Sequence, residues 1–316
     1  MANAERIAGV NSYLLYGAET TYGTPAPVTN HFGIVKDFKP GLKNNLITSR
    51  GYKGTTSGGR NVVKTTGGKF EVSFNVDFEP QLWDWLRYVL GGTRNGSGTG
   101  ANPYIYYEGN TISSLTVSNS IDNETTDREE QYLGCVISSV NIKSTVGEAV
   151  QVSIDFVAAK INKNTAIPST VELNTGDPYT FVGGSIEIPD GSPITNIIDS
   201  VEIIITRNAE ILHGLGSRVG KTGVVKARDY QVKFTVKYLD DDLMDLFLGS
   251  ATGPTNPTRS STMSIKFTNG NNKYIDFVFT GVTFESYDLG ATLNEVLSED
   301  ITAICESLTV REQQVA

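Results

Sequence analysis

Hydrophobic and polar residues alternate along two long segments of the chain, and each alternation predicts a β-strand with one buried face. In the first segment, the apolar positions are Phe70, Val72, Phe74, Val76 and Phe78. The second segment lies about 160 residues later, and its apolar positions are Tyr230, Val232, Phe234, Val236 and Tyr238. The same strand is therefore predicted in each half of the chain.

Each of these strands is followed by the pattern of a short helix and then of a hairpin. The first helix is expected to begin at Pro80 and to end at Gly91, and the second to begin after Asp240 and to end at Gly249. Two strands joined by a hairpin are expected next in each half, at about 134–143, 149–157, 275–286 and 292–304. Each half is thus predicted to be a small antiparallel sheet with one helix.

A long glycine-rich loop precedes the long strand in both halves. Ile47-Thr48 and Gly58 of the first copy recur as Ile205-Thr206 and Gly216, each 158 residues later. Both copies contain arginines, which are Arg50, Arg60, Arg207 and Arg218. A guanidinium on an extended loop suits contact with the carboxylates or carbonyls of another protein. A solvated hairpin with ordinary surface charge is the alternative.

The second copy contains the string HGLGSRVGKTG, which resembles a phosphate-binding loop. That motif requires a glycine where Leu215 stands, and it requires a helix after the loop. The residues after Gly223 alternate like a strand, and the first copy of the loop has no Gly-Lys-Thr. We therefore expect no nucleotide site, and a nucleotide-dependent enzyme using 216–222 is a rival hypothesis that Lys221→Ala would test.

Other reactive residues are few. His31 and His213 lie far apart and near no cysteine or acidic pair at metal-ligand spacing, and both are expected at the surface. Cys135 and Cys305 lie in apolar stretches, so we expect two buried thiols instead of a disulfide. No catalytic, cofactor-binding or metal-binding residue is predicted, and no enzyme activity.

Composition and charge narrow the function further. The chain has 316 residues, which is enough for two domains, and its net charge is −9. An acidic protein is unsuited to binding nucleic acid tightly, because affinity for nucleic acid comes from neutralising its phosphates. No apolar run reaches the length of a membrane span, and no secretory signal is recognisable at the start. We expect a cytosol-like compartment and no membrane anchor.

A polar stretch rich in turn residues, near 160–181, predicts a joint between the halves. The expected organisation is an N-terminal arm (1–30), a first module (31–160), a linker (161–180) and a second module (181–316).

The opening segment resembles the start of tail tube proteins of tailed phages and related viruses. Its sequence is YLLYGAETTYGTP, from Tyr13 to Pro25, and it contains the Glu-x-x-Tyr-Gly-Thr-Pro string that is common in that family. The order of loop, long strand, helix and hairpin also resembles the tube module over nearly the whole chain. The resemblance implies a mainly β fold, a sandwich or partial barrel with one short helix per module, in two tandem repeats that assemble into a β-barrel channel.

The resemblance also implies a function. The protein would be a structural virion protein that polymerises into stacked rings and forms the hollow tube through which viral DNA is delivered. Rings of this family have six modules, so two modules per chain imply a ring of three chains with pseudo-sixfold symmetry, in preference to six chains. The implied partners are other copies of itself and the tape-measure, tail terminator and baseplate or tip proteins. The implied location is the virion tail, assembled in the host cytoplasm.

DNA would pass through the lumen without specific binding, which an acidic or neutral wall favours. The lumen candidates are Glu71, Ser73, Asn75, Asp77, Gln151, Ser153 and Asp155. Lys233 and Lys237 hold the matching positions in the second half. Either that face is not the lumen there, or the lumen has alternating charge. Under this hypothesis, Arg50, Arg60, Arg207 and Arg218 make the contacts between rings.

Two alternatives stay open. One is a carbohydrate-binding or adhesive β-sandwich of a virion, in which Trp83 or Trp85 could stack on a sugar. The other is the inner tube of a contractile tail instead of the tube of a flexible tail.

Overall fold

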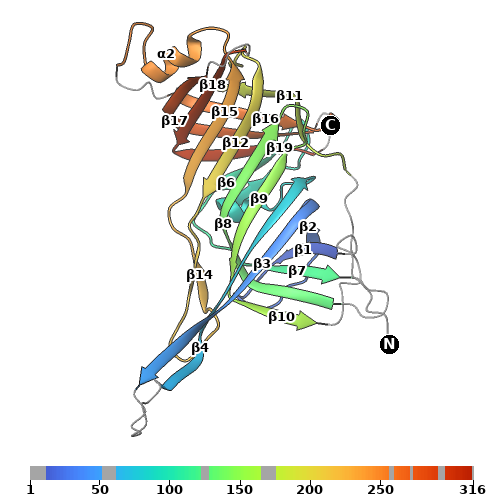
Figure 1. The fold of residues 1–316 in the computed structure, drawn as a ribbon. Helices are drawn as coiled ribbons and strands as arrows, with labels where there is room; N and C mark the ends of the chain where they lie inside the picture. Colours follow the sequence, from blue (N-terminus) through green and yellow to red (C-terminus); the bar gives the residue numbers. More distant parts are fainter. Residues whose placement is uncertain are drawn as a thin grey trace, which may run out of the picture.

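The computed structural model describes residues 12–51, 62–121, 128–164, 176–255, 260–270, 273–290 and 296–314. Most of these residues lie in antiparallel β-strands, with two short helices among them (Figure 1). The mainly β fold expected from the sequence is therefore confirmed. Within the described ranges, no helix has both the length and the apolar character needed to cross a membrane.

Eight strands of the described chain form one continuous antiparallel sheet that crosses both halves (Figure 1). We call it the long sheet, and its order is β3–β4–β9–β8–β12–β15–β18–β17. Its strands are β3 (Gly33–Gly51), β4 (Val62–Pro80), β8 (Arg128–Thr145), β9 (Gln151–Ala158), β12 (Ile198–Thr206), β15 (Asp229–Lys237), β17 (Tyr274–Gly290) and β18 (Ser298–Cys305). The halves join where β12 pairs with β8, with Ile203 opposite Ile142.

A second layer packs behind the long sheet in each half. In the first half it has the order β2–β1–β7–β8–β10, and in the second half β11–β16–β17–β19–β6–β5. The added strands are β1 (Ser12–Ala18), β2 (Asn30–His31), β5 (Gly91–Asn95), β6 (Tyr104–Glu108), β7 (Leu115–Ile121), β10 (Lys160–Asn164), β11 (Thr180–Glu187), β16 (Ser260–Thr268) and β19 (Ser307–Gln313).

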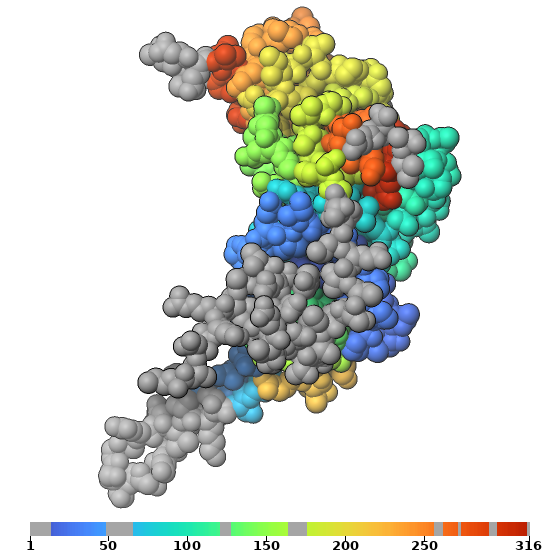
Figure 2. Space-filling model, turned by 90° about the vertical axis from the view of Figure 1, so that its right-hand side faces the viewer, coloured from blue at the N-terminus to red at the C-terminus, as the bar shows by residue number. Residues whose placement is uncertain are grey.

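The two halves of the chain are joined by shared strands. Strands β5 and β6 come from the first half but join the sheet of the second, and Figure 2 shows this teal segment against the orange-to-red segments. The described part of the predicted N-terminal arm contains β1, which pairs with β7 along its whole length. The domain boundaries expected from the sequence stay a prediction.

Strands β8 and β17 each run from one layer into the other through the same kind of bend. Each bends at a glycine with a left-handed backbone, Gly134 with φ 66° and Gly281 with φ 62°. A β-carbon at Gly134 would lie 2.9 Å from the Ala159 β-carbon, and one at Gly281 would lie 2.5 Å from a Glu306 carboxylate oxygen. The left-handed backbone itself disfavours any other residue at both positions. Three residues after each glycine, the pairing with β9 or β18 shifts by one residue.

The two helices are α1 (Leu86–Leu90) and α2 (Asp242–Leu248). Each ends at a left-handed glycine, Gly91 or Gly249, as the sequence predicts. The predicted start of the first helix is wrong, because Pro80 is still the last residue of β4. In the second helix the Asp240 carboxylate accepts a hydrogen bond of 3.2 Å from the Asp242 backbone N–H.

Buried aromatic side chains connect the two halves. Trp83 and Trp85 are both 0% exposed, and their ring centroids are 5.5 Å apart. The Trp83 ring also meets Tyr179 and Phe277 edge-on, each at 5.6 Å. Because Phe277 lies on β17, the core is shared between the halves.

Cys135 and Cys305 are both buried free thiols, which confirms the prediction for them. Burial raises the pKa of the Cys305 thiol to about 12 and that of Cys135 well above its usual value. Both thiols are therefore unreactive in the folded chain.

Candidate functional site

One face of the long sheet is buried and the other carries polar side chains. The seven lumen candidates, Glu71, Ser73, Asn75, Asp77, Gln151, Ser153 and Asp155, share the polar face of β4 and β9, because the residues between them are buried. Asn75 stands opposite Asp155, and its Nδ2 donates to Ser153 Oγ at 2.8 Å and to Asp155 Oδ1 at 3.0 Å. Local hydrogen bonds therefore occupy part of this surface.

The polar face continues without interruption into the second half. One row across the sheet places Lys143 opposite Glu202, Glu202 opposite Lys233, and Lys233 opposite Thr302. Lys233 and Lys237 thus lie on the same face as the acidic candidates of the first half. The polar face therefore carries charges of both signs across both halves, and which face lines the lumen in the second half stays a prediction.

Several charged groups of this face bind one another. The Lys237 ammonium lies 2.5 Å from an Asp199 carboxylate oxygen, and the Lys36 ammonium lies 3.0 Å from Glu79. Thr235 donates a hydrogen bond of 2.6 Å to Asp300. Mutual pairing of this kind weakens the external electrostatic field of a face.

The prediction for Arg207 is wrong. Its side chain is 1% exposed, and its Nη1 donates a 2.5 Å hydrogen bond to the Tyr88 carbonyl of α1. Burial, with the nearby Arg228 charge, lowers the pKa of Arg207 to about 10. A residue enclosed in this way cannot reach another ring; it connects the second half to the helix of the first. The side chains of Arg50 and Arg60 lie outside the described residues.

Arg218 fastens the loop of the second half to the hairpin of the first. The loop lies between β13 (Glu210–Leu212) and β14 (Thr222–Val224), next to the β3–β4 hairpin (Figure 1). Arg218 Nε donates to the Gly68 carbonyl at 2.9 Å, and its Nη2 donates to Asn44 Oδ1 at 2.6 Å. The residue stays exposed, so its predicted role between rings is neither supported nor contradicted.

His213 takes part in the same attachment. Its two ring nitrogens lie 3.1 Å from the carbonyl oxygens of Ile211 and Phe70, so it is a bridge between the halves and not a simple surface residue. The segment that resembled a phosphate loop is followed by strand β14, as the sequence predicts. Its Gly220 and Lys221 backbone N–H groups donate to Ala159 and Leu212 carbonyls, so they are not free to cradle a phosphate.

We expect Arg218→Ala to loosen this attachment while the fold persists. Loss of two hydrogen bonds should lower the local stability by about 1 kcal/mol. Amide exchange at Phe70 and along 213–221 should therefore become roughly fivefold faster. Hydrogen–deuterium exchange measures this rate. The control is Lys226→Ala, which lies between β14 and β15. Exchange rates equal to those of the unmodified chain would contradict the attachment.

The two outer edges of the long sheet are unpaired within the described residues. Strand β3 pairs only with β4, and the 283–290 part of β17 pairs only with β18. Both edges expose large apolar side chains, with Leu42 51% and Leu289 48% exposed. Natural proteins protect or pair such edges, so these two strands are candidate assembly sites. The β3–β4 hairpin also extends past the rest of the long sheet (Figure 1), and exposes Leu46 and Ile47.

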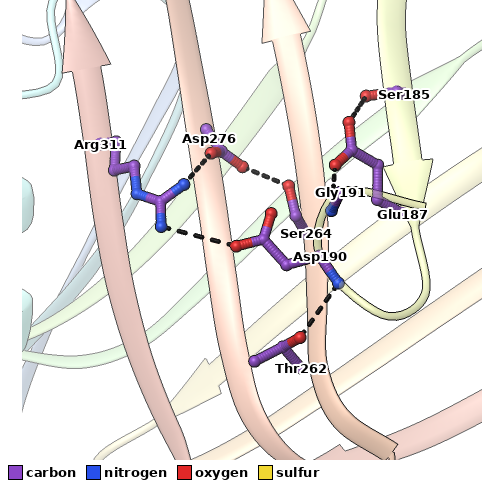
Figure 3. Close-up of polar contacts among 8 residues, drawn as sticks. All are labelled: Ser185, Glu187, Asp190, Gly191, Thr262, Ser264, Asp276 and Arg311. Carbon is purple, nitrogen blue, oxygen red and sulfur yellow. Dashed lines mark hydrogen bonds and ion pairs between the residues drawn. The ribbon is translucent and has the colours of Figure 1, made fainter. Parts of the chain in front are cut away.

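A polar network stabilises the outer layer of the second half (Figure 3). Arg311 lies between Asp276, at 3.3 Å, and Asp190, at 3.5 Å, and Ser264 donates a 2.5 Å hydrogen bond to Asp276. Burial raises the pKa of the Asp276 carboxyl. Because these groups satisfy one another, we interpret the network as structural.

Buried carboxyl groups predict a pH dependence of stability. Burial raises the pKa of Glu312, which accepts hydrogen bonds from the Tyr106 hydroxyl and, at 2.9 Å, from Gln314. Burial is also the main cause that raises the pKa of Asp276 and the pKa of Glu299. The folded state then binds more protons than the unfolded state, so stability falls as pH rises from about 4 through the raised pKa values.

We therefore expect urea unfolding to require more denaturant at pH 5 than at pH 8. Each unit by which a pKa is raised contributes about 1.4 kcal/mol to this difference. Glu312→Gln should reduce the difference, because the amide does not ionise. An equal midpoint at both pH values in the unmodified chain would show that these carboxyl groups do not titrate as their burial implies.

Within the described residues, no group of three or more metal-binding side chains comes together. What the structure presents is a two-faced sheet with open edges, which suits self-assembly. No curated protein matches the chain. A family model described as phage tail tube protein matches residues 9–309. The chain therefore belongs to the phage tail tube protein family and is a structural protein of a bacteriophage tail.

Proposed function

We propose that three copies of this chain close into a ring with pseudo-sixfold symmetry, and that such rings stack into the tube that delivers viral DNA. The observation that carries the proposal is the β8–β12 pairing, by which two four-stranded sheets already join edge to edge within one chain. The two outer edges, β3 and β17, are open in the described structure. Pairing them between chains would close the sheet and leave no edge.

The number three follows from treating the chain as two modules. Each half supplies four strands to the long sheet, a second layer, and one helix that ends at a left-handed glycine. Gly134 and Gly281 place the same bend at the same point of β8 and β17. These similarities support tandem modules, and six modules per ring then require three chains.

We propose that the polar face of the long sheet lines the channel. It carries all seven candidates of the first half, together with Lys233, Thr235 and Lys237 of the second. The opposite face packs against the second layers and cannot line a channel. Alternating, mutually paired charge and a net charge of −9 would let DNA slide without specific binding.

Contacts between stacked rings are assigned to the β3–β4 hairpin. It extends beyond the sheet and exposes Leu46 and Ile47, each 60% exposed. Arg218 binds this hairpin, and it remains our candidate for such contacts together with Arg50 and Arg60. In the assembled tail, the expected partners are the tape-measure, terminator and baseplate or tip proteins, with assembly in the host cytoplasm.

The adhesive alternative is not favoured. Trp83 and Trp85 are fully enclosed in the core, so neither can stack on a sugar. The choice between a contractile and a flexible tail would need a sheath partner to decide it.

Native mass spectrometry of the smallest closed ring tests the proposal. The expected mass is three times the 34.2 kDa of one chain. A ring of six chains would overturn the tandem-module account, although the tube itself would stand.

A further inference from the structure

We infer that β17 of one copy pairs antiparallel with β3 of a second copy, with Tyr287 opposite Leu42 and Ser286 opposite Lys43. The inference rests on the proposed ring, and it deepens that proposal by fixing the register of the contact between chains. It uses the β8–β12 junction inside the chain as the template.

The counterpart of β8 is β17. The bends at Gly134 and Gly281 align the two strands, and the one-residue shift follows at the same distance, between Ile137 and Ser139 or between Phe284 and Ser286. Position by position, Ser139 then corresponds to Ser286. In the same alignment Val140 corresponds to Tyr287, Asn141 to Asp288 and Ile142 to Leu289.

The counterpart of β12 is β3. Each strand shifts by one residue against its neighbour, between Val35 and Asp37 in β3 and between Ile198 and Ser200 in β12. After the shift, Asp37 faces Asp77 and Ser200 faces Thr235. Asp77 and Thr235 are 158 residues apart, as are the glycines that end the helices.

This alignment transfers the internal register to the outer edges. Inside the chain, Thr206 lies opposite Ser139, Ile205 opposite Val140 and Ile204 opposite Asn141. The counterparts of Thr206, Ile205 and Ile204 in β3 are Lys43, Leu42 and Gly41. This alignment of the paired strands replaces the match of Ile47-Thr48 with Ile205-Thr206 that the sequence suggested. Between copies, Lys43 is thus expected opposite Ser286, Leu42 opposite Tyr287, and Gly41 opposite Asp288.

Burial agrees with this register. Ile205 and Val140 at the internal junction are both 0% exposed. Their counterparts Leu42 and Tyr287 lie on the same, apolar side of the sheet, but Leu42 is 51% exposed. The neighbouring Leu289, counterpart of the buried Ile142, is 48% exposed. A second copy would bury the apolar side chains of the outer edges, as pairing of β8 with β12 buries their counterparts inside the chain.

The charges of the residues on the two outer edges also support this register. At the internal junction, Asn141 Nδ2 donates a 2.6 Å hydrogen bond diagonally to Glu202 Oε1. The counterparts of these residues are Asp288 and Lys39, which have opposite charges. Asp288 faces Asp300 within its own sheet and has no ion pair in the described part of the chain, and like charges placed opposite are unfavourable. A second copy would place Asp288 between Lys39 and Lys43.

Disulfide trapping in the full chain tests the register. Lys43→Cys with Ser286→Cys places two thiols directly opposite, within reach of a disulfide under mild oxidation. The matched control moves one thiol along the same face, as Lys39→Cys with Ser286→Cys, which is ~13 Å away along the strand. Native Cys135 and Cys305 are buried, and the unmodified chain under the same oxidant shows their background.

The expected result is chain-to-chain disulfide in the 43–286 pair at about tenfold or more above the 39–286 pair. Electron microscopy of the same reduced samples separates this inference from the proposed function. Rings without a 43–286 disulfide, or with an equal or stronger 39–286 disulfide, would overturn the register and leave the ring standing. Samples with neither rings nor disulfides would contradict both.

Discussion

Replacing Leu42 by Asp is expected to leave the chain folded but unable to form rings. The side chain is half exposed in the single chain, so a carboxylate there is solvated and costs little. In a ring, the same carboxylate would be enclosed beside Tyr287 without a partner, at a cost of several kcal/mol for each junction. Since a three-chain ring repeats this cost three times, the concentration needed for assembly should rise by more than about 100-fold.

Sedimentation of assembled material across a range of protein concentrations measures this effect. The matched control is Val182→Asp on β11, an exposed apolar residue in the outer layer that is 79% exposed. The control should assemble like the unmodified chain. Equal assembly of the Leu42→Asp chain would show that this edge of β3 stays solvated in the tube.

Trp83→Ala is expected to cause the largest loss of stability, about 3–5 kcal/mol. The Trp83 indole is fully buried and contacts Trp85, Tyr179 and Phe277. The loss of stability therefore combines lost burial of apolar area with a cavity at the junction of the halves. Because the contact joins the two halves, they should unfold together in a single transition.

Chemical denaturation of the unassembled chain measures both expectations, with Val182→Ala as the exposed control. A change below about 1 kcal/mol for Trp83→Ala would contradict the shared core. Two separate transitions in the unmodified chain would show that the halves are independent domains.

Local patterns in the sequence were sufficient to predict the two long strands and the ends of both helices. The alternation at 70–78 and 230–238 places β4 and β15 correctly, because a half-buried strand has a period of two. Gly91 and Gly249 end both helices as expected, since a left-handed residue is needed there. The seven lumen candidates share one face for the same reason of period.

Features that depend on distant partners could not be predicted from these patterns. A period of two cannot distinguish an offset of 160 residues from one of 158, and the pairing with β9 and β18 favours 158. Nothing in the chain near Arg207 indicates that α1 would cover it, so a loop arginine was expected and a buried one was found. The β8–β12 pairing likewise joins strands whose sequences give no sign of their partner.

Electron microscopy of the purified protein over a range of concentrations, with light scattering for mass, tests the central claim most directly. We predict hollow tubes or rings, each ring built from three chains with six similar lobes around a channel. A chain that stays monomeric at every concentration would contradict the account, because both edges of its long sheet would then be stable without a partner.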